Sequence, residues 1–198
     1  MNEIYDIGML REYLYDLRYH VVTIAVIFVL STIAGYVYTS MNPDSAALAL
    51  GELEGLIDIL KDLSPLEIML FIFLNNTIKS LFAILLGVGF GLVPIIFIAY
   101  NGYVLGVISY VTSSSEGLGF VLAAIIPHGI IELPMVILSV AIGLRLGQQA
   151  MYAIMGRDVR IKDELVKGIY VFMYWIVPML FVAAMVETFI TPLVASLI

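Results

Sequence analysis

Long apolar segments dominate this chain and restrict the folds open to it. The sequence is 62% hydrophobic and only 13% charged, whereas soluble domains are about 45–50% apolar and about 25% charged. A helix of roughly 20 apolar residues spans a bilayer with its backbone N–H and C=O groups paired within the segment. The sequence therefore predicts an all-α, polytopic transmembrane protein that forms one domain over residues 1–198. Five crossings are expected, at 20–39, 66–87, 92–112, 117–147 and 165–190.

The fourth segment, 117–147, is expected to be broken by prolines. As one straight helix it would extend about 45 Å, at roughly 1.5 Å per residue, which exceeds a hydrocarbon core of roughly 30 Å. Pro127 and Pro134 lack a backbone N–H and obstruct the preceding helical turn. Together with Gly129 they predict a helix break near the middle of this segment. The fifth segment is expected to kink near Pro178 for the same reason.

Two further helices are predicted outside the crossings. Residues 1–19 place apolar side chains on one side and charges on the other, which is typical of a helix at the membrane interface. Residues 45–62 form a second amphipathic segment, whose polar face is acidic. Ser64, followed by Pro65 and Glu67, then predicts the start of the second crossing.

Charge and cysteine content exclude several classes of function. The net charge of −7 argues against nucleic acid as a partner, because nucleic-acid binding requires a basic surface. The chain has no cysteine, which excludes disulfides and thiolate metal sites. The lipid bilayer is the partner that the composition itself predicts.

The distribution of basic residues predicts an orientation in the cell membrane. If the crossings alternate, only Lys61 falls on one side, and Lys79 lies within a crossing. Seven basic residues fall on the other side: Arg11, Arg18, Arg145, Arg157, Arg160, Lys162 and Lys167. Cytoplasmic loops carry an excess of Lys and Arg. The amino terminus is therefore expected in the cytoplasm, with 40–64 and the carboxyl terminus outside.

Polar and ionisable side chains recur inside the predicted crossings. They are Asn75, Asn76, Lys79, Asn101, His128, Glu132 and Glu187. A charged side chain at the bilayer centre costs roughly 2.5–3.5 kcal/mol on insertion scales, so such groups face the protein interior or a water-filled cavity. We expect these residues to form one intramembrane polar cluster, in which Lys79 pairs with Glu132 or Glu187.

This cluster admits three interpretations. Its members could pair their charges and hydrogen-bonding groups with one another and so fix the helix arrangement. They could instead carry protons or ions across the membrane. Alternatively, His128 and Glu132 share a helical face at i,i+4 spacing and could bind a divalent metal with Glu187 as a third ligand. The chain lacks a His-Glu-x-x-His motif, and its other histidine is His20. Apart from this metal alternative, no cofactor is expected.

Glycine pairs predict close helix packing. Small residues four positions apart let helix backbones approach in lipid. Four pairs have this spacing: Gly51/Gly55, Gly87/Gly91, Gly102/Gly106 and Gly143/Gly147. We expect tight helix contacts and a homo-oligomer, for which a two-fold dimer is the default.

Several of these motifs, taken in order, resemble a known family. The series begins with Asn75-Asn76 and Asn101-Gly102 and continues with the segment Pro-His-Gly-Ile-Ile-Glu-Leu-Pro at 127–134. Gly-Leu-Arg-Leu-Gly at 143–147 and Ala-Ala-Met-Val-Glu-Thr-Phe-Ile-Thr-Pro at 183–192 complete it. Over about 65–192 the chain resembles the stage II sporulation protein M family of small multi-span membrane proteins. In spore-forming bacteria, the family's namesake anchors an engulfment complex that recruits cell-wall-degrading partners.

The resemblance implies a non-enzymatic membrane scaffold or anchor that assembles with itself and with other membrane or envelope proteins. The alternative is a small transporter or channel component that uses the polar cluster. An intramembrane metal-dependent enzyme is the third hypothesis.

Overall fold

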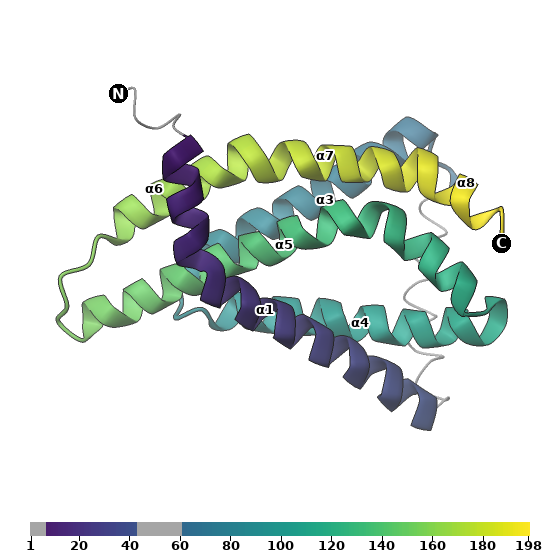
Figure 1. Cartoon of the computed structure of the whole chain (residues 1–198), viewed down its shortest axis with the longest axis horizontal. Helices are drawn as coiled ribbons and strands as arrows, with labels where there is room; N and C mark the ends of the chain where they lie inside the picture. The colour runs from purple at the N-terminus through teal and green to yellow at the C-terminus, as the bar shows by residue number, and fades with distance from the viewer. Residues whose placement is uncertain (1–6, 43–60) are drawn as a thin grey trace.

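The computed structural model describes residues 7–42 and 61–198, which form a bundle of helices (Figure 1). The described residues contain five helical segments long and apolar enough to cross a membrane. They are Leu10–Met41, Pro65–Val88, Leu92–Glu116, Leu118–Ile154 and Ile161–Ala195. The predicted polytopic all-α fold with five crossings is therefore confirmed. The amphipathic helix predicted at 45–62 falls almost entirely outside the described residues.

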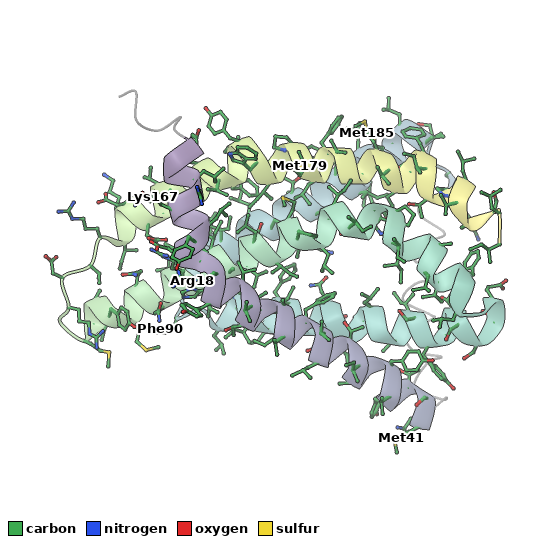
Figure 2. The ribbon with its side chains drawn as sticks, viewed as in Figure 1. Arg18, Met41, Phe90, Lys167, Met179 and Met185 are labelled. Carbon is green, nitrogen blue, oxygen red and sulfur yellow. The ribbon has the colours of Figure 1, made fainter. Side chains whose placement is uncertain are left out.

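Successive crossings run in alternating directions. The described helices are α1 (Ile7–Met41), α3 (Pro65–Leu85), α4 (Leu92–Glu116), α5 (Leu118–Ile154), α6 (Ile161–Val171), α7 (Val177–Met185) and α8 (Thr191–Ala195). The start of α1 and the carboxyl terminus lie at opposite ends of the bundle (Figure 1). Arg18 and Lys167 lie near the first of these ends, whereas Met41 marks the far end of α1 (Figure 2).

The amino-terminal region differs from the prediction. From Ile7 onward, the residues of the interfacial helix expected at 1–19 and the crossing expected at 20–39 form one helix, α1, whose ribbon changes direction near Arg18 (Figures 1 and 2). Residues 1–6 lie outside the described residues. No proline or glycine separates the two segments, so nothing ends the helix there. Tyr13 and Leu17 are buried in a core cluster that also contains residues of α5 and of the last crossing. The first limb of α1, from Ile7 to the bend near Arg18, therefore packs against other helices of the bundle.

The fourth crossing is one helix where a break was expected. α5 is helical throughout Leu118–Ile154, with Pro127 and Pro134 inside it. The prolines coincide with a bend in the ribbon and do not interrupt the helix (Figure 1). A proline removes one backbone hydrogen bond and displaces the preceding turn, which a long helix accommodates by bending. The helix also continues past its predicted end at Gly147, as far as Ile154.

Two π-helical turns interrupt the α-helical geometry of the last crossing. η2 (Phe172–Ile176) ends two residues before Pro178, and η3 (Val186–Ile190) ends two residues before Pro192. Each wider turn precedes a proline whose ring would clash with a carbonyl of a regular α-helix. The kink expected near Pro178 therefore takes the form of a π turn.

The predicted signal at the start of α3 is confirmed. The backbone N–H of Ser64 donates to Glu67 at 2.7 Å, and the Glu67 N–H donates to the Ser64 hydroxyl at 3.4 Å, which together cap α3. The short 3₁₀ turn η1 (Leu86–Val88) then leads into a tight hairpin. Phe90 and Gly91 adopt positive φ values of 60° and 73° in this hairpin, immediately before α4.

Glycines place helix backbones in direct contact. A Cβ atom built on Gly106 of α4 would lie 2.0 Å from the Thr32 carbonyl oxygen of α1. One built on Gly143 of α5 would lie 2.1 Å from the Ala83 carbonyl oxygen of α3. Gly147 faces the backbone of Gly91 in the same way. The predicted close packing is confirmed for three glycine pairs, and these contacts lie within one protomer. Gly51 and Gly55 lie outside the described residues.

We predict that Gly106→Ala destabilises the protein. The added methyl group meets α1 backbone, which cannot rotate away, and overpacking of this kind costs about 1–3 kcal/mol. Gly119→Ala in α5 is the matched control, because its Cβ would meet only Ile198 Cγ2, at 3.5 Å. Thermal unfolding in detergent should show a lower melting temperature for Gly106→Ala than for Gly119→Ala. Equal melting temperatures would contradict the described α1–α4 contact.

Candidate functional site

The structure brings the predicted polar residues together from four crossings. A cavity of about 200 Å³ is lined by residues of α1, α3, α4 and α5. Its polar lining consists of Asn76, Lys79, Ser80, Asn101, His128 and Glu132, and Gly129 also lines it. Asn75 lies beside this lining and donates from its amide to Asn76 at 3.4 Å.

Glu187 completes the cluster from the last crossing. One ligand atom from each of His128, Glu132 and Glu187 lies within 4.8 Å of the other two. His128 and Glu132 stand one turn apart on α5, and Glu187 lies in the π turn η3. All three side chains are partly buried. This arrangement places one imidazole and two carboxyl groups around a common point, which we call the His–Glu–Glu centre.

Thr191 orients the histidine of this centre. The Thr191 hydroxyl donates to the carbonyl oxygen of Val186 at 3.2 Å and lies 3.3 Å from His128 Nδ1. Because its single hydrogen is directed to Val186, the hydroxyl oxygen can accept from Nδ1–H of His128. This hydrogen bond leaves Nε2 as the nitrogen with a free lone pair. In the sequence Thr191 is only one member of a motif, and its role depends on a contact 63 residues away.

Lys79 lines the cavity without a close carboxylate partner. Among the described residues, no ion pair of 4.0 Å or less joins Lys79 to Glu132 or Glu187. Lys79 and Asn101, with Phe97, also line a second cavity of about 430 Å³ between α3 and α4. This cavity is open at the surface of the bundle, where Lys79 and Tyr100 are exposed. The expected Lys79 pairing is therefore absent as a direct contact, and Lys79 lies where two cavities meet.

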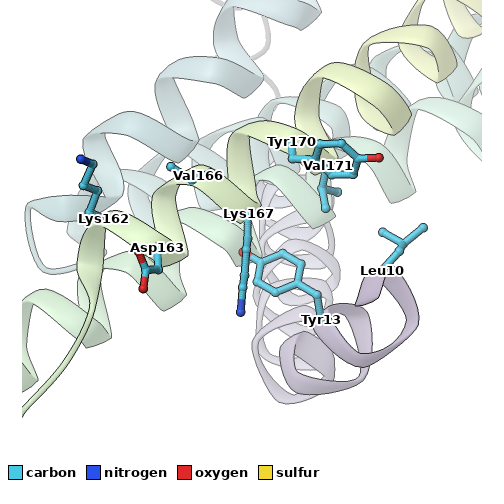
Figure 3. A pocket seen from close by; sticks show the side chains of 8 residues that line it. All are labelled: Leu10, Tyr13, Lys162, Asp163, Val166, Lys167, Tyr170 and Val171. Carbon is cyan, nitrogen blue, oxygen red and sulfur yellow. The ribbon is translucent and has the colours of Figure 1, made fainter. Parts of the chain in front are cut away.

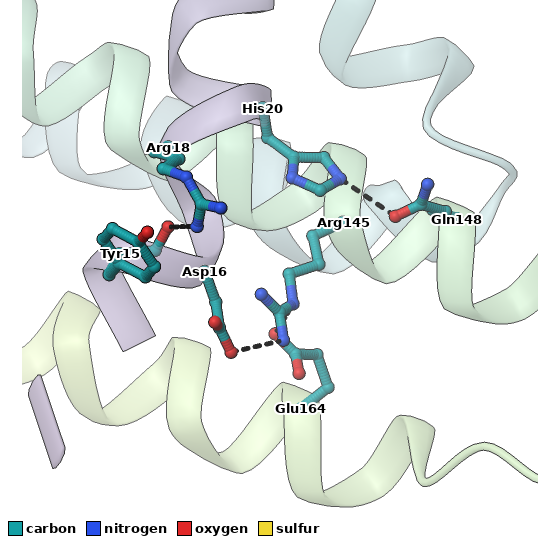
Figure 4. Close-up of polar contacts among 7 residues, drawn as sticks. All are labelled: Tyr15, Asp16, Arg18, His20, Arg145, Gln148 and Glu164. Atoms are coloured by element: carbon teal, nitrogen blue, oxygen red, sulfur yellow. Dashed lines mark hydrogen bonds and ion pairs between the residues drawn. The ribbon is translucent and has the colours of Figure 1, made fainter. Parts of the chain in front are cut away.

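A second polar network, which the sequence did not predict, joins three helices near the α1 bend. Arg145 Nε of α5 lies 2.7 Å from Glu164 Oε1 of α6, and Arg145 Nη2 lies 3.5 Å from Asp16 Oδ2 of α1 (Figure 4). Close by, His20 Nε2 lies 3.0 Å from Gln148 Oε1 (Figure 4). Glu164 is buried, and its charge is compensated by Arg145. The arginine of Gly-Leu-Arg-Leu-Gly was the available signal, but its acidic partners lie far away in sequence.

An apolar hollow opens between the first limb of α1 and α6. Its volume is about 240 Å³, and Leu10, Tyr13, Val166 and Val171 supply part of its wall (Figure 3). Lys167 also borders it (Figure 3). It is separate from the His–Glu–Glu centre and shares no lining residue with the cavity beside that centre.

The family model for stage II sporulation protein M matches residues 24–192 of this chain. The chain belongs to this family. The match confirms the resemblance inferred from the ordered motifs, and it extends further towards the amino terminus, into α1. All residues of the His–Glu–Glu centre, and Thr191 beside it, fall within the matched range.

One similar protein comes from an archaeon, and its name describes no activity. "Uncharacterized protein MJ0793" of Methanocaldococcus jannaschii is 29% identical over 126 residues, which cover 62% of this chain and 71% of the relative. No solved structure matches the chain. Fold and membrane location therefore follow from the family and from the five crossings, while the function of the centre is argued from its geometry.

We predict that the two polar networks respond oppositely to the same substitution. In metal-free protein, Glu132→Gln or Glu187→Gln should raise stability by about 0.5–2 kcal/mol, because each removes repulsion between neighbouring carboxylates and keeps a hydrogen-bonding group. Glu164→Gln should lower stability, because it removes the negative charge that pairs with Arg145 in the protein interior. Loss of one partner of a buried pair costs about 3–5 kcal/mol, and the amide should retain part of the interaction.

Thermal unfolding in detergent with a chelator present measures these changes. A loss of stability in all three variants would mean that the His–Glu–Glu centre holds the fold together, as the Arg145 network does.

Proposed function

We propose that this protein is a small transporter or channel component, and that a cationic species binds at its intramembrane His–Glu–Glu centre. One observation carries the proposal: a cavity inside the crossings is lined by amide, ammonium, imidazole and carboxyl groups and adjoins this centre. Ionisable side chains within membrane crossings typically line ion or substrate pathways or proton relays. A purely structural cluster would instead be expected to pair its charges directly.

The pairing of charges supports transport over a structural role. Lys79 has no carboxylate within ion-pair distance among the described residues, and the carboxyl groups of Glu132 and Glu187 face one another and His128. The Arg145 network shows that the same fold can place a cation beside a buried carboxylate. The contrast favours a centre whose missing charge is supplied by a bound cation.

Two adjoining cavities offer an access route. The cavity beside the centre shares Lys79, Phe97 and Asn101 with the second cavity, which extends along α3 and α4 to Leu86 and Val93 near their hairpin. Asn101 donates from its amide to the Phe97 carbonyl at 2.7 Å, so its side-chain oxygen can serve a solute. In this proposal Lys79 and Asn101 control passage between the two cavities.

Reconstitution into liposomes tests the transport proposal. Purified protein should dissipate an imposed proton or divalent-cation gradient, which dyes trapped in the lumen would report. Lys79→Met keeps most of the side-chain volume and removes its charge, so we expect it to change the flux. Lys162→Met, a lysine that borders the distant apolar hollow, should leave the flux unchanged. Flux no greater than that of protein-free liposomes would refute this proposal.

A non-enzymatic scaffold or anchor is the second candidate. It is favoured by the backbone contacts at Gly87, Gly106 and Gly143, which make the described bundle a closely packed body on which other proteins could assemble. Because these glycines contact helices of the same protomer, a homodimer would have to use other faces. The outer side of α1, with Val26, Leu30 and Ile33 exposed, offers one such face.

We also propose an orientation for the bundle. The predicted cytoplasmic residues gather on the start of α1, the end of α5 and α6, which Figure 1 draws at one end of the bundle. By the positive-inside rule this end faces the cytoplasm. The α4–α5 turn and the carboxyl terminus would then lie outside the cell.

Single cysteines test the orientation without interference from native thiols, because the chain has none. In intact cells, an impermeant maleimide should label Ser115→Cys in the last turn of α4 and leave Arg157→Cys unlabelled until the cells are opened. Labelling of Arg157→Cys alone in intact cells would reverse the proposed orientation. Labelling of both variants from outside would contradict the topology of the crossings.

A further inference from the structure

We infer that the His–Glu–Glu centre is a binding site for a divalent transition-metal ion of the zinc class. The inference rests on the proposed function for its biological meaning, since it names the cation that the transporter would bind. The binding itself is argued from His128, Glu132 and Glu187 and from the residues that surround them.

The charge of the His–Glu–Glu centre favours a divalent cation as its ligand. When both carboxyl groups are ionised and the imidazole is neutral, the centre carries a charge of −2, which a divalent ion cancels at one point. Ionised carboxylates inside a membrane crossing are costly without a compensating charge. Among the described residues, neither Glu132 nor Glu187 has an ion pair with Lys or Arg that could supply it.

The ligand types select the class of metal. Imidazole nitrogen with carboxylate oxygen suits Zn²⁺ and neighbouring first-row ions, whereas Ca²⁺ and Mg²⁺ prefer oxygen ligands throughout. Ligands about 2.1 Å from Zn²⁺ in tetrahedral geometry lie about 3.4 Å apart. The described separation of up to 4.8 Å therefore requires the ligand atoms to move closer together by up to about 1.4 Å. Three protein ligands leave a position open for water or an exchanging ligand, as a transport site requires.

Thr191 provides an independent observation that points to a metal. Its hydroxyl, held by the Val186 carbonyl, faces Nδ1 of His128 and leaves Nε2 as the nitrogen that can bind a cation. Histidines that bind metals are usually oriented through a hydrogen bond at their other ring nitrogen. The π turn η3 carries both Glu187 and the Val186 carbonyl, so one local distortion presents a ligand and orients another.

The metal has a route to the centre. His128 and Glu132 border the cavity of about 200 Å³, whose remaining polar lining includes Asn76 and Asn101. These amide side chains can replace part of the hydration shell of an entering ion. Lys79 lies in the same lining and would restrict the number of cations that the cavity can hold.

Direct metal binding tests this inference. Protein freed of its affinity tag and treated with a chelator should bind one Zn²⁺ per protomer in detergent, as measured by titration calorimetry. Co²⁺ in its place should give visible absorption bands that report nitrogen and oxygen ligands. Mg²⁺ added in excess should not displace Zn²⁺.

Variants assign the site. His128→Ala, Glu132→Gln and Glu187→Gln should each abolish stoichiometric Zn²⁺ binding, whereas His20→Ala removes the other histidine and should leave it unchanged. Thr191→Val keeps the shape of the side chain and removes the hydroxyl, so Zn²⁺ affinity should fall about 10–100-fold. Elution volume and melting temperature of each metal-free variant establish that it is folded.

The outcomes separate this inference from the transport proposal. Absence of Zn²⁺ binding in the unmodified protein, or binding that survives in folded His128→Ala and Glu187→Gln variants, would refute the metal site. Proton flux without Zn²⁺ binding would refute the metal site and leave transport standing. Stoichiometric Zn²⁺ binding at these residues without flux would support the metal site and refute transport.

Discussion

Backbone-to-backbone contact around α5 is the constraint on which the described structure depends. A bilayer offers little hydrophobic drive for one apolar helix to bind another, so association depends on close van der Waals contact and on polar groups. Gly143 and Gly147 let α5 touch α3 and the α3–α4 hairpin, and a side chain at either position would overlap backbone atoms. With α5 held at the centre, His128 and Glu132 are presented to the last crossing, where Glu187 faces them.

Two polar networks within this packing follow different physical principles. Around Arg145, opposite charges from three helices meet, and the buried Glu164 has a cation 2.7 Å away. At the His–Glu–Glu centre, two carboxyl groups and an imidazole meet without such a cation among the described residues. Natural proteins retain locally unfavourable arrangements mainly where function requires them. The difference between the networks is the physical basis for assigning function to one and stability to the other.

The prolines connect the fold with this centre. Pro127 and Pro134 flank His128 and Glu132 within the bent α5, and Pro192 follows the π turn that carries Glu187. In the π turn before Pro192, the carbonyl of Val186 accepts from both the backbone N–H and the hydroxyl of Thr191. Family membership and five crossings establish a multi-pass membrane protein. Whether the centre serves transport or assembly depends on whether it binds a cation.

Local composition and spacing were enough to predict the crossings, the cap at Ser64 and the family. They also selected the polar residues, since ionisable groups in apolar segments are conspicuous. Only the tertiary structure shows that Tyr13 and Leu17 of α1 pack into a core cluster with α5 and the last crossing, and that the glycines contact helices of their own protomer. It also shows that Lys79 lacks a close carboxylate partner among the described residues. It also supplied the contacts of Thr191 with His128 and of Arg145 with Glu164. These contacts join residues remote in sequence, and their distances depend on how the helices bend and cross, which local patterns do not encode.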